Sequence, residues 1–182
     1  MTIRLSKDQA DMRQIQALQA RNHRQVVDDK QKADQGFVSI IHEPEVLWQM
    51  HLRSPHVVAE EKGQIVGYAL SMNKEFGTSI HELQSTLDII DKSIYKEELL
   101  RDTPYLIMGQ VCVAHTARGQ KLVDRMYEFM KQTYRDQYRF FVTVISLHNP
   151  RSIRVHERCG FEELFRESDE QDEWVTVIMD WH

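Results

Sequence analysis

The sequence predicts a mixed α/β fold in one domain, and two observations support that class. Segments with helical periodicity alternate along the chain with short runs whose composition and alternation are typical of strands. The chain has 182 residues, of which 41% are hydrophobic and 28% are charged. That length suits one hydrophobic core and makes a second independent core unexpected. We therefore expect a single domain over residues 1–182.

Composition and charge narrow the classes of partner. The formal net charge is -5, whereas a nucleic-acid binder needs a basic surface, so we expect no nucleic acid and weakly favour a cationic or amine-bearing partner. Residues 1–14 lack the apolar core of a signal peptide and no apolar run could span a membrane, so we expect a cytoplasmic protein without membrane contact. Cys112 and Cys159 show no paired spacing and the nine histidines show no ligand spacing, so we expect no metal.

The N-terminal quarter predicts an edge strand and two helices. Thr2–Leu5 alternates polar and apolar residues, and Ser6 is a plausible N-cap for the helix that follows. Residues 22–35 are polar, and loops of this kind often shape binding pockets. After a short apolar patch, Pro44 suits the first position of a second helix. We expect residues 22–41, together with the later connection 77–104, to form the acceptor cleft.

The next segment predicts a hairpin followed by a long connection. Val57–Glu61 and residues 65–72 read as strands joined by a tight turn through Lys62 and Gly63. The second strand is apolar on both faces, which favours a central place in the sheet. Residues 79–82 have the S-x-x-E spacing of a capping box before a helix. That helix belongs to the connection 77–104, which we expect to act as a lid, a binding element or an interface.

A strand, a turn and a helix occupy residues 105–134. Tyr105–Val113 is an apolar run, residues 114–119 are polar, and the apolar residues from Leu122 onward recur at helical spacing. The start of this helix combines unpaired N–H groups and a positive dipole end with two nearby cations, which is a natural anion site. The alternative is an ordinary strand-to-helix turn with solvated charges.

The C-terminal quarter completes the sheet. Residues 139–146 are aromatic and β-branched, as in a core strand. Asn149 as N-cap and Pro150 at the first position begin a short helix that Gly160 ends. Residues 161–166 and 174–181 predict a closing hairpin, and we expect the acidic residues 169–173 at its tip to be solvated.

Two segments together resemble the GNAT superfamily of N-acetyltransferases: ARGQKLVDRMYEFM at residues 117–130 and, after the next strand, NPRSIRVHERCGF at residues 149–161. The family's phosphate motif is Q/R-x-x-G-x-G/A. Arg118 matches its first position, while Lys121 and Val123 stand where glycine and glycine or alanine are usual. The resemblance implies a mixed, mostly antiparallel sheet flanked by helices and splayed where acetyl-coenzyme A (acetyl-CoA) enters.

The second segment resembles the family pattern N-x-x-A/S-x-x-x-Y-E-x-x-G-F, with His156 at the tyrosine position. In the family that tyrosine is credited with protonating the departing thiolate, so the resemblance makes His156 the catalytic candidate. Backbone N–H groups of the central strand are the expected contacts for the thioester and the pantetheine arm. The resemblance implies cofactor contacts at Val111, Val113, Arg118, Gly119, Gln120, Lys121, Leu122, Val123, Asn149 and Ser152.

The resemblance implies an enzyme that transfers an acetyl group from acetyl-CoA directly to an amine, with a small molecule as the expected acceptor. The general base stays open among His115, His148, Glu60 and a water chain. The alternative function is a coenzyme A-binding regulatory or interaction module without turnover, because three positions depart from the family pattern. Exposed strand edges and the helix after residue 80 would also permit a homodimer.

Overall fold

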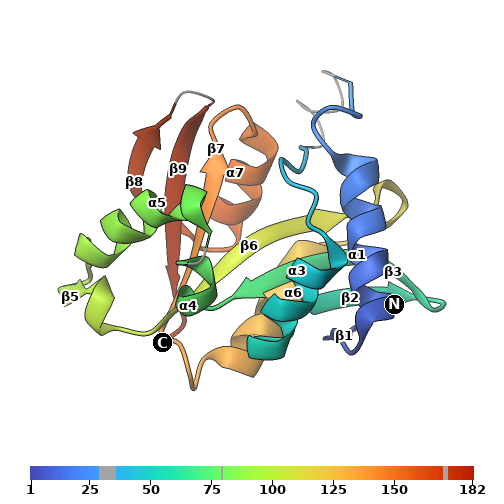
Figure 1. Cartoon of the computed structure of the whole chain (residues 1–182), viewed down its shortest axis with the longest axis horizontal. Coiled ribbons are helices and arrows are strands. Elements are labelled where there is room, and N and C mark those ends of the chain that lie inside the picture. The colour runs from blue at the N-terminus through green and yellow to red at the C-terminus, as the bar shows by residue number, and fades with distance from the viewer. Residues whose placement is uncertain (29–35, 79, 170–171) are drawn as a thin grey trace.

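A seven-stranded sheet forms the centre of the protein, with strand order β1-β2-β3-β6-β7-β9-β8 (Figure 1). The computed structural model describes residues 1–28, 36–78, 80–169 and 172–182, and of residues 81 and 82 only the backbone. Within that part, all neighbouring strands of the sheet pair antiparallel except β6 and β7, which are parallel. The predicted mixed, mostly antiparallel α/β fold is therefore confirmed.

The sheet strands are β1 (Thr2–Leu5), β2 (Val57–Glu61), β3 (Gln64–Met72), β6 (Tyr105–Val113), β7 (Phe140–Ser146), β8 (Glu162–Ser168) and β9 (Glu173–Asp180). Two short strands, β4 (Ile94–Tyr95) and β5 (Glu98–Leu99), form a separate hairpin. The helices are α1 (Gln9–Asn22), α3 (Pro44–Arg53), α4 (Lys74–Gly77), α5 (His81–Lys92), α6 (Leu122–Tyr134) and α7 (Pro150–Arg158), with single 3-10 turns at Leu100–Asp102 and His115–Ala117. None of these helices is both long and apolar enough to cross a membrane.

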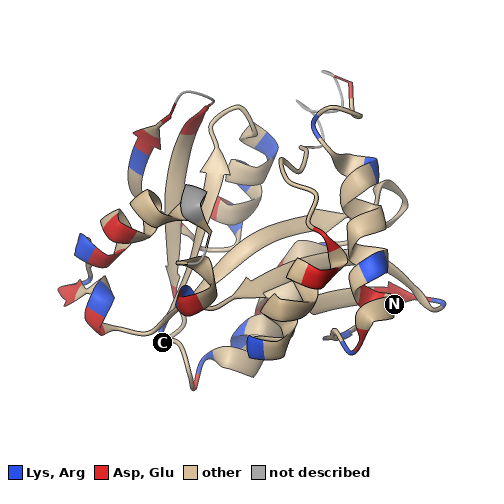
Figure 2. Cartoon of the chain, in the orientation of Figure 1, with Lys and Arg blue, Asp and Glu red and all other residues tan. Residues whose placement is uncertain are grey.

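Helices cover both faces of the sheet (Figure 1). On one face, α1, α3 and α5 bury residues such as Met12, Leu47 and Ile90 against the strands. On the other face, α6 buries Met126 and Met130 in a second core. Because β3, β6 and β7 carry no Lys, Arg, Asp or Glu (Figure 2), any charge near the middle of the sheet comes from turns and helix ends.

A bulge and a separation of two strands shape the middle of the sheet. Ala69 lies opposite Val111 whereas Ser71 lies opposite Met108, so β6 carries one extra residue at positions 109–110. Beside it, β6 and β7 pair only from Tyr105–Phe140 to Ile107–Val142. The Thr143 hydroxyl still donates to the Met108 carbonyl at 2.9 Å. Beyond that contact the two strands diverge and leave a gap between their C-terminal ends (Figure 1).

Several expected local features are confirmed. The strand Thr2–Leu5 lies at the edge of the sheet, and Lys62 and Gly63 form the β2–β3 turn, both with positive φ. The predicted helix starts at Pro44 and at Asn149 with Pro150 are also present. The capping residue Ser79 lies outside the described residues, although the helix itself is present from His81.

The expected N-cap at Ser6 is wrong. Asp8 caps α1 instead, because its carboxylate accepts hydrogen bonds from the backbone of Ala10 and Asp11. Ser6 extends the sheet ladder through its N–H to the His56 carbonyl, which pulls the residue into the interior. There its hydroxyl bonds to His51 Nδ1 at 2.8 Å and accepts the His56 N–H at 2.9 Å.

The expected solvated acidic tip of the last hairpin is wrong at one position. Asp172 is buried, and its carboxylate accepts hydrogen bonds from the Ser146 hydroxyl and from His148. The charge pattern suggested a surface turn, but these partners come from the end of β7 and are distant in sequence. A carboxylate can be buried only when such donors replace the lost water.

Candidate active site

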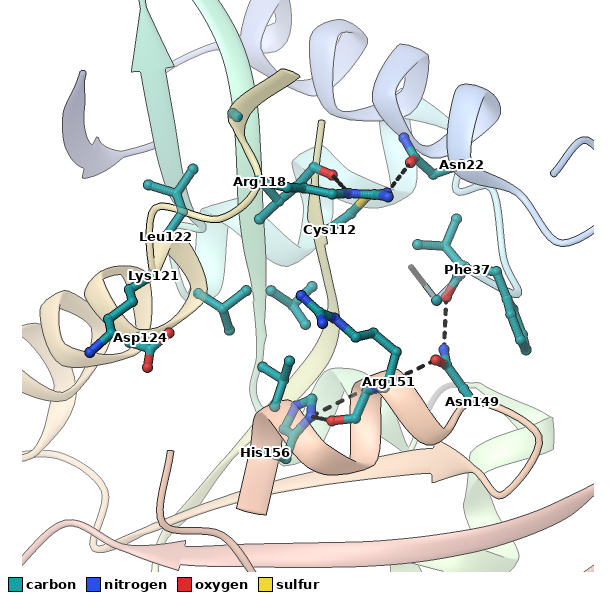
Figure 3. A pocket seen from close by; sticks show the side chains of 18 of the residues that line it. Asn22, Phe37, Cys112, Arg118, Lys121, Leu122, Asp124, Asn149, Arg151 and His156 are labelled. Carbon is teal, nitrogen blue, oxygen red and sulfur yellow. Dashed lines mark hydrogen bonds between the residues drawn. The ribbon is translucent and has the colours of Figure 1, made fainter. Parts of the chain in front are cut away.

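A cavity of about 290 Å³ occupies the gap between β6 and β7. Its walls come from the end of β6, the turn before α6, the first turn of α6, the length of α7, and the end of α1 with the segment 36–38 (Figure 3). Such a volume suits a narrow chain better than a bulky ligand. Of the predicted site residues, those lining the cavity are Val111, Val113, Arg118, Gly119, Lys121, Leu122, Val123, Asn149, Ser152 and His156.

Gln120 is the predicted cofactor residue that does not line the cavity. It is exposed in the turn between Gly119 and Lys121, both of which have positive φ. Consecutive residues of a turn point in different directions, so sequence adjacency to a binding segment did not place this side chain in the site. No cofactor contact by the Gln120 side chain follows from the geometry.

The backbone of β6 faces the cavity at the two predicted positions. The Ala114 N–H donates to the Val66 carbonyl at 2.8 Å, so Ala114 and Val66 form a hydrogen-bonded pair with β3. Bonded and non-bonded pairs alternate along an antiparallel ladder, so Val111 and Val113 direct their N–H and C=O groups away from β3, toward the gap. Because the bulge lies just before this stretch, β7 is too distant to take those bonds.

The N-terminus of α6 is open. Lys121 precedes the helix with φ 51° and ψ 37°, the left-handed conformation, and no described side chain caps the helix. The N–H groups of Leu122 and Val123 therefore have no hydrogen-bond acceptor among the described residues, and they lie at the positive end of the helix dipole. Gly119 has φ 78° and open space around it. A left-handed residue at 121 also explains why glycine is usual there, since a side chain costs about 1–2 kcal/mol in that conformation.

The mouth of the cavity carries more positive than negative charge. Among its described lining residues are the cations Arg118, Lys121, Arg151 and Arg158 and one carboxylate, Asp124 (Figure 3). Arg158 donates to both oxygens of Asp124 at 3.1 and 2.7 Å, and this pairing holds the pKa of that carboxyl below its usual value. With its carboxylate neutralised, the mouth favours an anionic ligand.

The Arg118 side chain connects the end of β6 to α1. Its Nε donates to the Val113 carbonyl at 3.1 Å and its Nη2 donates to Asn22 Oδ1 at 2.9 Å (Figure 3). Burial lowers the pKa of the guanidinium from its ordinary value, but an arginine stays charged at any physiological pH. The residue that matches the family motif therefore fixes the end of β6 to α1.

The N-terminus of α7 is closed by its own residue. Asn149 Oδ1 accepts the Ser152 N–H at 3.2 Å, and Asn149 Nδ2 donates to the Phe37 carbonyl at 3.1 Å (Figure 3). The second bond ties the segment after α1 to the cavity wall. Gly36 permits the close approach, because a Cβ there would lie 2.9 Å from Asn149 Oδ1.

His156 is buried beside the cavity with both ring nitrogens engaged. Nδ1 lies 2.8 Å from the Ser152 carbonyl and therefore carries the proton, and Nε2 accepts from the Tyr127 hydroxyl at 2.8 Å. Burial lowers the pKa of His156 to about 4, so the ring is neutral near pH 7. Ser152 lines the cavity, and its hydroxyl lies 3.4 Å from Nδ1. Nothing in the sequence indicated Tyr127 as a partner.

A polar network behind the bulge was not predicted. Gln110 Oε1 accepts from the Tyr68 hydroxyl at 2.5 Å and from Gln19 Nε2 at 2.9 Å, and Gln110 Nε2 donates to the Ile40 carbonyl at 3.0 Å. Gln19 also accepts the His42 N–H at 2.8 Å. The network fixes the segment after α1 over the bulge. Its members are distant in sequence and follow no motif, so only the fold could bring them together.

These features agree with the family comparison. A model described as the acetyltransferase (GNAT) family matches residues 15–161, and the chain therefore belongs to the GNAT acetyltransferase family, as its sequence motifs predicted. No curated protein sequence matches this chain significantly.

Solved structures share the fold along the whole chain. A Drosophila melanogaster polyamine N-acetyltransferase that forms N-acetylagmatine is 15% identical, with a TM-score of 0.69 over 98% of this chain and 99% of that one. YncA, a putative acetyltransferase from Salmonella typhimurium solved with acetyl-CoA, is 17% identical, with a TM-score of 0.63 over 100% and 94%. A ribosomal-protein-alanine N-acetyltransferase from Brucella melitensis is 20% identical, with a TM-score of 0.61 over 99% of both chains. At these identities the likeness is one of fold.

Proposed function

We propose that this protein transfers an acetyl group from acetyl-CoA directly to the amine of a small molecule. The observation that carries the proposal is the gap between β6 and β7, where the backbone of Val111 and Val113 faces a narrow cavity that ends at the open N-terminus of α6. Preorganised N–H groups on a strand suit a thioester oxygen, and a helix N-terminus suits a pyrophosphate. The net charge of -5 favours a cationic acceptor.

The residues of the cavity fit coenzyme A in two parts. The N–H groups of Leu122 and Val123, the flexible backbone of Gly119 and the ammonium of Lys121 would hold the phosphates. Val111 and Val113 would hold the pantetheine arm through their backbone. When bound, acetyl-CoA supplies a thioester whose carbonyl is attacked and whose sulfur departs. Arg118 and Asn149 keep the walls in place, since both side chains are bonded within the chain.

The departing sulfur needs a proton, and we assign its delivery to His156 through Ser152. The Nδ1–H of His156 bonds to the Ser152 carbonyl and lies within reach of the hydroxyl of Ser152, a residue that lines the cavity. In His156→Gln the amide keeps the bonding to Tyr127 and Ser152 but cannot relay a proton. We expect kcat to fall about 100-fold or more, the usual contribution of acid–base catalysis. An unchanged kcat at saturating amine would exclude this role.

Binding of coenzyme A is the first experiment, because every version of the function needs it. At a coenzyme A concentration about 100 times Kd, the ligand should stabilise the fold by about 2.7 kcal/mol, which thermal denaturation detects as a higher Tm. Thiol release from acetyl-CoA is then followed with a panel of amines that includes agmatine, spermidine and lysine. Release that depends on an amine supports the proposed transfer.

A second function is a coenzyme A-binding regulatory module without turnover. It is favoured by the residues at 121, 123 and 156, which differ from the family pattern, and by the engaged ring of His156. A rise in Tm with coenzyme A but no amine-dependent thiol release would select this alternative. No rise in Tm would overturn both functions.

A further inference from the structure

A histidine and a buried carboxylate form a pair at the C-terminal end of β7. His148 Nδ1 lies 2.5 Å from Asp172 Oδ1, and the Ser146 hydroxyl donates to Asp172 Oδ2 at 2.8 Å. The backbone N–H of Glu173 also donates to Oδ1 at 2.9 Å. The Asp172 side chain is 1% exposed while that of His148 is 67% exposed. A fixed internal carboxylate thus holds a ring that faces outward.

The pair determines which ring nitrogen carries the proton. Burial would raise the pKa of Asp172, but the hydrogen bonds from His148 and Ser146 outweigh burial and keep the pKa below its ordinary value. A carboxylate only accepts hydrogen bonds, so neutral His148 carries its proton on Nδ1 and presents a lone pair on Nε2. Nε2 makes no hydrogen bond to any residue that the structure describes. An exposed, oriented imidazole of this kind can accept a proton from a ligand.

The surrounding charges are few. Arg24, from the segment after α1, approaches Asp172 Oδ2 at 3.7 Å. The Asp169 carboxylate accepts the Asp172 N–H at 2.8 Å. Within the described chain, Asp172 is the charged group bonded to the His148 ring, and Arg24 and Asp169 are charged groups that contact Asp172.

The pair shares a rim with the cavity. His148 directly precedes Asn149, which lines the cavity and holds the Phe37 carbonyl. Arg24, which approaches Asp172, lies over the Phe37 ring at 5.4 Å. The C-terminal ends of β7, β8 and α1 and the N-terminal end of β9 all lie in the upper part of Figure 1. Helix α1 covers the face of the sheet opposite α6 and α7. An acceptor bound beside the His148–Asp172 pair would therefore meet, across the gap, a cofactor bound between α6 and α7.

The other candidate bases lack this arrangement. Glu60 lies on β2 and bonds to Arg4 Nε at 2.8 Å, at the edge of the sheet next to β1. His115 is exposed in the turn before α6, and no carboxylate among the described residues bonds to it. His148 alone among the three combines an orienting carboxylate with a place at the rim of the gap.

We propose that Nε2 of His148 takes the proton from the ammonium group of the acceptor, with Asp172 as the residue that positions the ring. This role rests on the proposed acetyl transfer. One proton moves from the ammonium to Nε2, and the nitrogen lone pair then forms a bond to the thioester carbonyl carbon. The C–S bond breaks with its electron pair on sulfur, and the sulfur takes the proton that His156 delivers through Ser152. The second proton of the acceptor nitrogen replaces the proton that this relay gave up. The products are the N-acetyl amine, free thiol and a proton that His148 releases to water.

The test compares kcat/KM for the best amine of the panel in wild-type protein, His148→Gln and the control His182→Gln, an exposed histidine at the C-terminus. Loss of a general base costs about 100-fold or more near neutral pH. The deficit of His148→Gln should shrink toward about pH 10, where the amine loses its proton to water unaided. The amide N–H of glutamine can still donate to the buried Asp172 carboxylate, so Tm should change little. A merely structural residue would not give a deficit that depends on pH.

A spectroscopic measurement tests the pair without turnover. In ¹⁵N-edited NMR of the wild-type protein, the His148 signals should show the Nδ1–H form, and Asp172→Asn should shift them toward a mixture of tautomers. A wild-type ring in the Nε2–H form would overturn the role, as would an active His148→Gln enzyme with an unchanged pH profile. No thiol release by the wild-type protein with any amine would instead overturn the proposed function itself, and with it this role.

Discussion

The two helices that flank the cavity begin in opposite ways. Both follow a strand at the edge of the gap, α6 after β6 and α7 after β7. At the start of α7, Asn149 satisfies the Ser152 N–H with its own side chain and holds Phe37 as well. At the start of α6, Lys121 is left-handed and no described side chain caps the helix. Helix α7 uses a backbone N–H group at its start within the fold, whereas α6 leaves its first N–H groups for a ligand.

This contrast shows that a match to the family motif does not by itself tell whether a residue binds the ligand. The start of α7 matches the family pattern closely, yet its asparagine is occupied in capping and bracing. The start of α6 departs from the pattern at Lys121 and Val123, yet its backbone has the geometry that the usual glycine would provide. In both cases the backbone conformation and its unsatisfied groups say more about binding than the residue type does.

The largest expected effect concerns His156 in α7, and it is a loss of folding stability at acidic pH. Folded His156 has a pKa of about 4, below the value of about 6.5 in an unfolded chain, so between these values the unfolded state binds more protons. The free energy of unfolding should therefore fall as pH drops from about 6.5 to about 4, by about 3 kcal/mol from this residue alone. Buried His56, with a pKa of about 3, acts in the same direction.

Urea unfolding between about pH 7 and pH 4.5 measures this loss. His156→Gln should show a weaker pH dependence, because its amide keeps the bonds but does not titrate. The exposed His182→Gln should follow the wild-type curve. Equal pH dependence in wild type and His156→Gln would mean that His156 is not held neutral between α6 and α7.

Removing the cap of α7 should have the next largest effect. Asn149→Ala loses the bond to the Ser152 N–H and the bond to the Phe37 carbonyl, and we expect the free energy of unfolding to fall by about 1–2 kcal/mol. Asn149→Asp keeps the cap but not the donor, so its stability should be intermediate. If Asn149→Ala instead kept its stability and lost coenzyme A affinity, α7 would be a ligand-binding terminus like α6.

A charge reversal at the open helix should affect binding and spare the fold. In Lys121→Glu the phosphates would face a carboxylate, and we expect coenzyme A affinity to fall at least tenfold, or about 1.4 kcal/mol. The same carboxylate suits the N-terminus of a helix, so stability should be unchanged or slightly higher. Lys62→Glu is the matched control, because Lys62 has the same φ of 51° in the distant β2–β3 turn. Calorimetric titration with coenzyme A measures both variants.

The sequence predicted those parts of the fold that depend on local patterns. Hydrophobic periodicity located the strands and the helices, and turn residues such as Gly63 and Pro150 located their ends. The errors arose where distant residues compete with a local pattern. Ser6 resembles a helix cap until the ladder with β2 draws it inward, and Asp172 resembles a surface charge until β7 supplies its donors.

The site was predictable as far as its motifs extend. The turn before α6 and the start of α7 were expected to bind a cofactor, and apart from Gln120 the expected residues meet around one cavity. Sequence reasoning missed the groups that join segments far apart, such as Tyr127 with His156 and Gln110 with Gln19. It named His148 among several bases without a way to choose, because the deciding partner lies 24 positions away. Such pairs follow from tertiary packing and leave no local signal.

The smallest expected effect separates backbone strain from charge at the open helix. Lys121→Gly and Lys62→Gly both relieve a left-handed lysine, a gain of about 1–2 kcal/mol that is partly offset by the greater freedom of glycine in the unfolded chain. We expect a net rise in the free energy of unfolding of at most about 1 kcal/mol, equal in the two variants. Urea unfolding measures both.

Only Lys121→Gly should also alter coenzyme A binding, and by little. Glycine lets the backbone approach the phosphates more closely but removes an ammonium, so we expect an affinity within about threefold of wild type. A much tighter complex would mean that the lysine side chain crowds the site more than its charge helps. Unchanged affinity in both Lys121→Gly and Lys121→Glu would remove the charge of Lys121 from the binding account. The backbone N–H groups at the start of α6 would then bind the phosphates without help from a side chain. The difference between α6 and the capped helix α7 would then lie in the backbone alone.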